Sequence, residues 1–159
     1  YLMLKAAGVA EDENEARTMM EKVIASGKAL DKFADFVEAQ GGRKEQVYHP
    51  QLLAKAAITE TITAPEDGYV EALNAMAIGT ACMSLGGGRA TKESQIDLTA
   101  GIRLKKKIGD SVKKGECLAE LYGNDAEKCN DAKELVQNAF LFSKEPLDAP
   151  ETVLKYITA

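Results

Sequence analysis

The sequence predicts an α+β protein in which helices come first and strands with inserted helices follow. Apolar residues recur at helical spacing through residues 12–37, which indicates amphipathic helices. Alternating β-branched residues at 58–63 and glycine-bounded apolar runs within 64–122 predict strands. We therefore divide the chain into a helical segment, residues 1–57, and a β-rich domain, residues 58–159.

The helical segment opens with residues 1–8, which look like the last turns of a helix that ends at Gly8. Natural chains rarely begin inside a helix, so we expect the sequence to be part of a longer protein. Asp12, with Glu15 three residues later, predicts a capped helix start. The apolar face of this helix would consist of Ala16, Met19, Met20, Val23 and Ile24.

Two further helices are predicted before the strands begin. Ser26-Gly27 separates the first helix from a second one, whose apolar stripe lies within residues 29–37 and which stops at Gly41-Gly42. A short third helix is predicted for residues 51–57, because Pro50 suits the first position of a helix.

The β-rich domain is predicted to begin with strands at 58–63 and 69–75, joined by a turn that contains Pro65 and Gly68. Residues 77–85 then predict a short helix closed by three glycines. The polar residues 90–97 predict a mobile loop.

The second half of this domain is predicted to contain two strands followed by a long helix. Strands are predicted at 98–104 and 117–122, joined by a turn containing Gly109 and Gly115. Asn124 or Asp125 would cap a long helix with Cys129, Ala132, Val136, Ala139 and Phe140 on one face. Pro146 and Pro150 mark an extended passage that leads to a terminal strand at 152–157.

Composition narrows the possible partners. The 159 residues carry a net charge of −5, which disfavours a nucleic-acid surface. The lysines at 105–107 and 113–114 are interpreted as a solvated hairpin face rather than an anion site. We find neither a signal peptide nor an apolar run of about 18 residues, and therefore expect no membrane span. Three cysteines without a CxxC pair predict reduced thiols in a cytoplasmic protein and no metal site.

Few residues suggest chemistry by themselves. Gly86-Gly87-Gly88-Arg89 could present amides and a guanidinium to an anion, but it matches no nucleotide-binding motif, and a helix exit that requires glycine is the preferred interpretation. His49, the single histidine, has no nucleophile beside it in sequence. Glu66-Asp67 is a pair of carboxylates, but acidic residues are common in turns, so the pair does not by itself indicate catalysis. These residues alone indicate a soluble α+β domain without an assembled active site.

The order of short motifs closely resembles the C-terminal part of the pyrimidine-nucleoside phosphorylases, the family that includes thymidine phosphorylase. The resemblance extends from Tyr1 to the end of the chain. The matching residues are Ala29 and Phe33, Ala39-Gln40-Gly41-Gly42, Ala64-Pro65, Gly68-Tyr69-Val70, Ile78-Gly79, Leu85-Gly86-Gly87-Gly88-Arg89, Ile96-Asp97, Gly101-Ile102, Lys107-Ile108-Gly109-Asp110, Val112 and Gly115-Glu116.

This resemblance implies a specific fold. Residues 1–57 would be the helical end of a larger α/β domain. Residues 58–159 would form an α/β-hammerhead, a barrel-sandwich-like β module with flanking helices. The hammerhead strands resemble biotinyl and lipoyl carriers, which would explain the Gly-Asp-x-Val-x-x-Gly pattern at 109–115.

The resemblance also implies an activity for the parent protein. Family members use phosphate to cleave the N-glycosidic bond of pyrimidine nucleosides, and they release the base and (deoxy)ribose 1-phosphate without an organic cofactor. The family's phosphate- and base-binding residues would lie before Tyr1, as would the α domain that forms a homodimer. No catalytic or substrate-binding residue is therefore assigned here, and the fragment is expected to be inactive. Gly88 and Arg89, in the loop 88–97, are candidates for holding the closed state of the domains.

Two alternatives remain open at this point. A biotinyl- or lipoyl-carrier module would need a modifiable lysine at a hairpin tip, whereas Gly123-Asn124-Asp125 follows the strand at 117–122. A non-catalytic interaction domain is the other possibility. Residues 1–159 also leave the choice between thymidine and uridine open.

Overall fold

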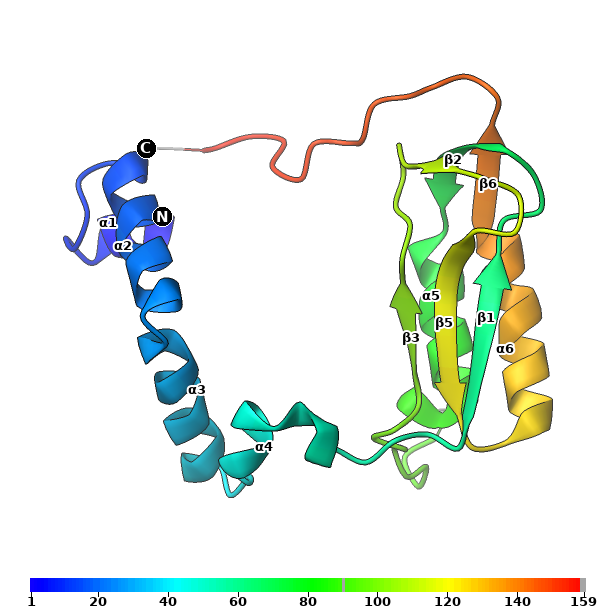
Figure 1. The fold of residues 1–159 in the computed structure, drawn as a ribbon, viewed down its shortest axis with the longest axis horizontal. Helices are drawn as coiled ribbons and strands as arrows, with labels where there is room; N and C mark the ends of the chain where they lie inside the picture. The colour runs from blue at the N-terminus through cyan, green and yellow to red at the C-terminus, as the bar shows by residue number, and fades with distance from the viewer. Residues whose placement is uncertain (90, 158–159) are drawn as a thin grey trace. The chain divides into compact units, whose positions relative to one another are not determined.

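A computed structural model describes residues 1–89 and 91–157 of the chain (Figure 1). The chain forms two compact units, one comprising Tyr1–Leu53 and the other beginning at Ala54. The combination of helices with antiparallel sheets confirms the predicted α+β class.

The first unit consists of helices alone. Its elements are α1 (Leu2–Ala6), α2 (Glu13–Ala25), α3 (Lys28–Ala39), the short α4 (Glu45–Tyr48) and the 3₁₀ turn η1 (Pro50–Leu52). The side chain of Asp12 accepts a hydrogen bond from the Glu15 amide at 2.9 Å, which confirms the predicted cap of α2. Gly27, with a φ of 78°, separates α2 from α3.

The first unit has almost no apolar core of its own. Its buried apolar residues, within the described part of the chain, are Ala10, Ala16 and Ala34. Polar contacts hold α4 against α3: the Tyr48 hydroxyl donates to Asp31 at 2.8 Å, and Lys44 pairs with Asp35 at 2.6 Å. The larger apolar side chains therefore lie on the surface of this unit.

The second unit is built from two three-stranded antiparallel sheets. One sheet has the strand order β1-β5-β3, formed by Ile58–Thr63, Cys117–Gly123 and Gly101–Leu104. The other has the order β4-β2-β6, formed by Ser111–Val112, Gly68–Leu73 and Phe140–Ser143. Figure 1 shows β5 between β1 and β3. The strands predicted around 58–75 and 98–122 thus pair within one folded unit.

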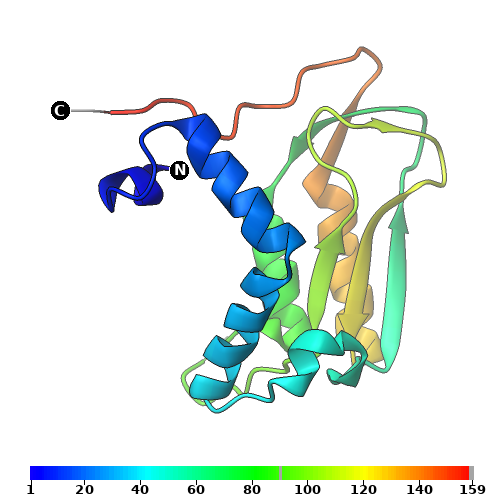
Figure 2. The ribbon, with the colours of Figure 1, turned by 60° about the vertical axis from the view of Figure 1, so that its left-hand side comes forward.

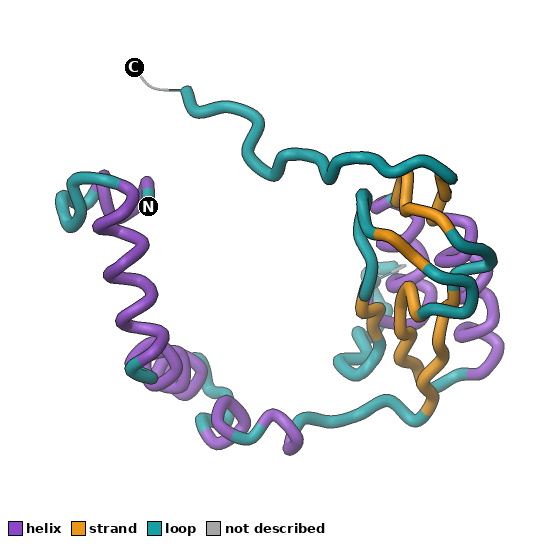
Figure 3. The backbone as a smooth tube through the Cα atoms, turned by 45° about the horizontal axis from the view of Figure 1, so that its top comes forward, coloured by secondary structure: helices purple, strands orange, loops and turns teal. Residues whose placement is uncertain are grey.

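Helices cover these sheets. After β2, the chain enters α5 (Ala75–Cys82), which continues as the π-helical turn η2 (Met83–Gly87). Helix α6 (Ala126–Ala139) packs against α5, β1 and β5, and Figures 2 and 3 show the two helices side by side next to the strands. The largest fully buried side chains of this shared core are Ile62, Val70, Leu118, Leu121 and Val136.

Several predicted boundaries were wrong. The helix predicted at 51–57 is only η1, and α4 was missed. The strand predicted at 98–104 begins at Gly101. Phe140, predicted to lie on the long helix, begins β6 instead, with φ −94° and ψ 130°, and pairs with Leu73.

The terminal strand predicted at 152–157 was also wrong. These residues form no strand, and no backbone hydrogen bond involves them in the described part of the chain. Leu154 and Ile157 are 85% and 89% exposed. An apolar alternating sequence becomes a strand only when a neighbouring strand supplies partners for its amides, and the described chain supplies none here.

Candidate functional site

The backbone conformation and close packing after α5 require glycine at two of the three consecutive glycine positions. Gly86 has a φ of 103°, a conformation that residues with a side chain rarely adopt. A β-carbon at Gly87 would lie 2.8 Å from the Cys82 sulfur and 3.2 Å from the Ala100 carbonyl oxygen. These two glycines therefore allow the chain to turn out of the helix and pass close to the start of β3.

Gly88 and Arg89, the candidate residues for domain closure, follow this turn. Gly88 is half-buried in an extended conformation, and Arg89 is exposed. Among residues 1–89 and 91–157, no hydrogen bond or ion pair is found for the Arg89 guanidinium. Part of the predicted loop 90–97 lies outside the described residues, at position 90. Further along, Thr91 and Ser94 form a local turn in which the Thr91 amide donates to the Ser94 hydroxyl at 3.0 Å.

The far end of this loop is fixed by Asp97. Its backbone amide donates to the Gly86 carbonyl at 2.9 Å, so the two ends of the loop are joined. Its carboxylate accepts hydrogen bonds from the Thr99 amide at 2.9 Å and the Thr99 hydroxyl at 2.7 Å. These bonds, those from Thr99 first, and a further one from the Asn124 side chain hold the pKa of Asp97 below its ordinary value.

Asn124 links this loop end to another part of the chain. Its amide nitrogen donates to Asp97 at 2.7 Å and to the Thr99 hydroxyl at 2.8 Å. Its amide oxygen accepts from the Ala57 amide, just before β1, at 2.8 Å. We call Ala57, Gly86, Asp97, Thr99 and Asn124 the Asn124 corner. Sequence reasoning missed it, because Asn124 was weighed only as a helix cap, a role that Asp125 fills by accepting from the Glu127 and Lys128 amides.

Three of the five lysines of the basic hairpin pair with acids. Lys105 pairs with Glu120 at 3.0 Å, Lys106 with Glu116 at 2.6 Å and Lys113 with Asp67 at 3.5 Å. The hydrogen bonds from Lys106 and from the Lys113 amide lower the pKa of Glu116. This pairing supports the interpretation of a solvated face rather than an anion site.

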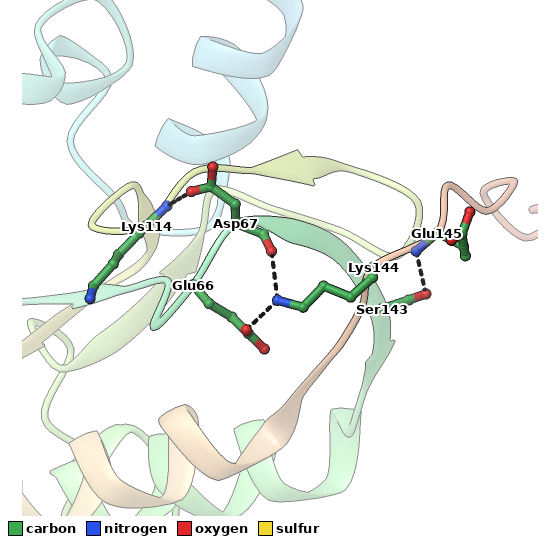
Figure 4. Close-up of polar contacts among 6 residues, drawn as sticks. All are labelled: Glu66, Asp67, Lys114, Ser143, Lys144 and Glu145. Atoms are coloured by element: carbon green, nitrogen blue, oxygen red, sulfur yellow. Dashed lines mark hydrogen bonds and ion pairs between the residues drawn. The ribbon is translucent and has the colours of Figure 1, made fainter.

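The carboxylate pair at the turn before β2 has structural partners as well (Figure 4). The ammonium of Lys144 bonds to the Glu66 carboxylate and to the Asp67 carbonyl oxygen. The Asp67 carboxylate accepts from the Lys114 backbone amide at 2.7 Å, which lowers its pKa. This turn therefore ties the end of β6 to the β4–β5 connection.

An apolar groove of about 550 Å³ lies in the second unit. It is bordered by Leu73, Ala75, Ile78, Leu104, Lys107, Ile108, Ala149, Pro150 and Thr152. The segment after β6 forms one wall and passes so close to the hairpin turn that a β-carbon at Gly109 would lie 2.9 Å from the Ala149 nitrogen. Lys107 is the one basic side chain among these lining residues, and none of them is acidic.

The remaining candidate groups do not converge. His49 is exposed between α4 and η1, with Gln51 at 3.4 Å as its hydrogen-bond neighbour. Cys129 is buried, which raises the pKa of its thiol, whereas Cys82 and Cys117 are half-buried. Over the described residues, no group of three or more metal-binding side chains is present. None of the described helices is both long and apolar enough to span a bilayer.

Comparison with known proteins finds relatives that match nearly the whole chain. Residues 69–143 match the family described as "Pyrimidine nucleoside phosphorylase C-terminal domain". The chain is 44% identical over 158 residues to the pyrimidine-nucleoside phosphorylase of Geobacillus stearothermophilus, covering 99% of this chain and 35% of that protein. It is 48% identical over 122 residues to the Bacillus subtilis enzyme of the same name, covering 77% of this chain and 28% of that protein.

The pyrimidine-nucleoside phosphorylase of Staphylococcus aureus is 38% identical over 156 residues, covering 98% of this chain and 36% of that protein. The chain thus spans about a third of the length of the curated relatives that it matches. Because the similarity extends over nearly the whole chain, and the match to the family's C-terminal domain lies within the β-rich unit, the chain belongs to the pyrimidine-nucleoside phosphorylase family.

Proposed function

We propose that this chain is the C-terminal structural part of a pyrimidine-nucleoside phosphorylase. The parent enzyme would transfer the pentosyl group of a pyrimidine nucleoside to phosphate, giving the free base and (deoxy)ribose 1-phosphate. The observation that carries the proposal is the 44% identity over 99% of the chain to an enzyme of this name, of which the chain spans only 35%. The parent would be a cytoplasmic homodimer that dimerises through an α domain not contained in these residues.

The architecture of the second unit supports the α/β-hammerhead assignment for residues 58–159. Two small antiparallel sheets share one core and are flanked by α5 and α6. The residues between Gly109 and Gly115 include β4 and connect β3 to β5. Residues 1–57 would then belong to the preceding α/β domain, in keeping with the separate helical unit Tyr1–Leu53.

The role assigned to residues 1–159 is that of a scaffold. Phosphorolysis needs phosphate positioned against the anomeric carbon and stabilisation of the departing base. Three of the five hairpin lysines are paired with carboxylates, which makes these three poorly suited to hold phosphate. We therefore propose that catalytic groups come from the two thirds of the parent enzyme that this chain does not match.

Arg89 is proposed to assist domain closure. Arg89 is exposed on a loop whose two ends are joined through Gly86 and Asp97, and its guanidinium is accessible to another domain. An exposed guanidinium suits a contact with a carboxylate or carbonyl of another domain. Gly88, half-buried just before it, would hold the backbone at that point.

A chimaera tests the scaffold role. This chain would replace the matching third of the Geobacillus stearothermophilus enzyme, and phosphate-dependent cleavage of uridine would be measured. We expect turnover by the chimaera and none by residues 1–159 alone. Turnover by the chain alone would place the active site within it, and a folded but inactive chimaera would contradict the proposed scaffold role.

The same chimaera tests Arg89. An Arg89→Ala variant should lower kcat/KM about tenfold, a size typical of one lost charge-assisted contact, while Lys92→Ala in the same loop serves as control. Unchanged kinetic constants for Arg89→Ala would remove it from the closure.

The carrier alternative is disfavoured by the path of the chain after β5. Instead of a hairpin with a lysine at its tip, Gly123 leads directly through Asp125 into α6. An intact mass equal to that of the unmodified sequence is expected for the purified protein. An added biotinyl or lipoyl group would favour the carrier function.

A further inference from the structure

Four segments that are distant in sequence meet at the Asn124 corner. They are the linker before β1, the exit from η2, the end of the loop after Arg89, and the end of β5. Residues 54–57, the first residues of the second unit, follow directly on the helical unit and precede β1; we call them the linker. Within the described residues, the bond from the Ala57 amide to Asn124 is the one hydrogen bond that these linker residues make.

The two ends of the Asn124 side chain act on different segments. Its oxygen holds the linker, and its nitrogen holds Asp97 and Thr99. A carboxamide is needed because one end must accept and the other must donate. Rotation of the side chain to release one segment therefore breaks the bonds to the other.

Asp97 extends this connection to the glycine turn. Its carboxylate is bound by Asn124 and Thr99, and its backbone amide is bound to the Gly86 carbonyl. The Asp97 carboxylate and amide are attached to the same α-carbon, so a displacement of the residue that follows loss of its carboxylate bonds also moves its amide. The closing bond of the loop that carries Arg89 thus depends on the same corner that holds the linker.

We propose that the Asn124 corner couples the linker at Ala57 to the loop that follows Gly86, so that loosening either segment loosens the other. The coupling runs through Asn124 and Asp97 and lies wholly within this chain. It would allow a displacement of the helical unit about residues 54–57 to be transmitted to Arg89. Such a device needs no ligand, and its test does not depend on phosphorolysis.

Residue-resolved amide hydrogen exchange of the 159-residue chain tests the coupling in both directions. Asp97→Ala does not touch the linker, yet exchange at the Ala57 amide should rise roughly fivefold to tenfold, the equivalent of one lost hydrogen bond. Asn124→Ala should raise exchange at the Asp97 amide by a similar factor, although that amide bonds to Gly86. Asn130→Ala, at an exposed position of α6, is the matched control and should change neither amide.

Asn124→Asp separates coupling from simple loss of an acceptor. This variant keeps an oxygen for the Ala57 amide but places a second carboxylate against Asp97, which opens the loop side by charge repulsion. The proposal requires Ala57 exchange to rise even so. Unchanged Ala57 exchange in both Asp97→Ala and Asn124→Asp would overturn it.

Exchange at Leu121 reports on the whole unit, because β5 pairs there with both β1 and β3. Coupling at the corner predicts a larger change at Ala57 and Asp97 than at Leu121. Equal changes at all three amides would mean that the substitutions destabilise the unit as a whole, and would also overturn the proposal. Asp97→Ala and Asn124→Ala should each lower the protection of the Ala57 amide relative to Leu121. In the double variant, these two decreases should not add, because both changes break the same connection.

Discussion

At the scale of single residues, the ionisable groups of the second unit form short hydrogen bonds that shift their pKa values in opposite directions. The Tyr122 hydroxyl donates to the Glu120 carboxylate at 2.6 Å, and Lys105 pairs with the same carboxylate. These contacts, the Tyr122 bond first, lower the pKa of Glu120. The same bond raises the pKa of Tyr122, because ionisation of the phenol would remove the donor and place two negative charges together.

The stability of the second unit should therefore decline at both ends of the pH scale. Glu120 and Asp97 have lowered pKa values in the folded state, so their contribution is present above the unfolded pKa of about 4 and is lost as pH falls through the folded values. Tyr122 contributes below its unfolded pKa of about 10, and this contribution is lost as pH rises through the folded value.

Urea unfolding at a series of pH values, followed through the amide signals of β5, measures the loss of stability at low pH and at high pH. Tyr122→Phe should weaken the decline at high pH and also reduce the decline at low pH, because Glu120 loses the donor that lowers its pKa. Tyr69→Phe is the control, since the Tyr69 hydroxyl has no hydrogen bond within the described residues. Identical pH profiles for the Tyr122→Phe variant and the unmodified protein would contradict the assigned role of this bond.

At the scale of elements, what could be predicted depended on whether the cause was local. Asp12 and Glu15 predicted the start of α2 correctly, because a capping box is formed by residues within one four-residue segment. The alternation at 58–63 predicted β1 correctly because one face of that strand is buried, with Ile62 fully enclosed. Such signals need no knowledge of distant segments.

Elements fixed by distant partners escaped prediction. β4 is only Ser111–Val112 and exists because Gly68 and Tyr69 pair with it. Phe140 leaves the helix because β2 offers Leu73 as its partner, and no glycine or proline marks the change. Residues 152–157 have a strand-like sequence but find no partner among the described residues.

In the candidate site, too, local features could be predicted and features that depend on distant residues could not. That Gly86 and Gly87 serve a helix exit could be predicted, because three glycines after an apolar helix favour a backbone turn. The Asn124 corner could not, since its members lie between positions 57 and 124 and are all common surface residue types. The activity proposed for the parent rests on relatedness to a family, and the described residues contain no cluster of metal-binding side chains that would indicate chemistry of their own.

At the scale of the whole molecule, the two units differ in how they are stabilised. The second unit encloses Ile62, Leu118 and Leu121 completely. The first unit buries only alanines among its described apolar residues, while Ile24, Phe33 and Phe36 are 69%, 54% and 61% exposed. Apolar area of this kind on one set of helices is typical of a surface that another protein segment covers.

The purified chain should therefore associate with itself through the α2 and α3 faces. Burial of apolar surface drives this association, so it should increase with protein concentration and strengthen in sulfate, which favours apolar burial. Sedimentation velocity between about 10 µM and 1 mM would detect it, because this is the range expected for weak contacts. A double variant, Phe33→Glu with Phe36→Glu, should sediment as a monomer throughout, whereas Leu98→Glu, at a residue 92% exposed in the second unit, should behave as the unmodified chain.

The chimaera tests whether the apolar faces of α2 and α3 are normally covered by the preceding domain of the parent enzyme. If the helical unit belongs to the preceding domain of the parent enzyme, joining that domain should cover the same face, and the association through Phe33 and Phe36 should disappear. The Phe33→Glu and Phe36→Glu changes would then destabilise the chimaera, because each would bury a carboxylate without a partner. A chimaera that tolerates both changes, or an unmodified chain that stays monomeric at every concentration, would show that these side chains are not an interface.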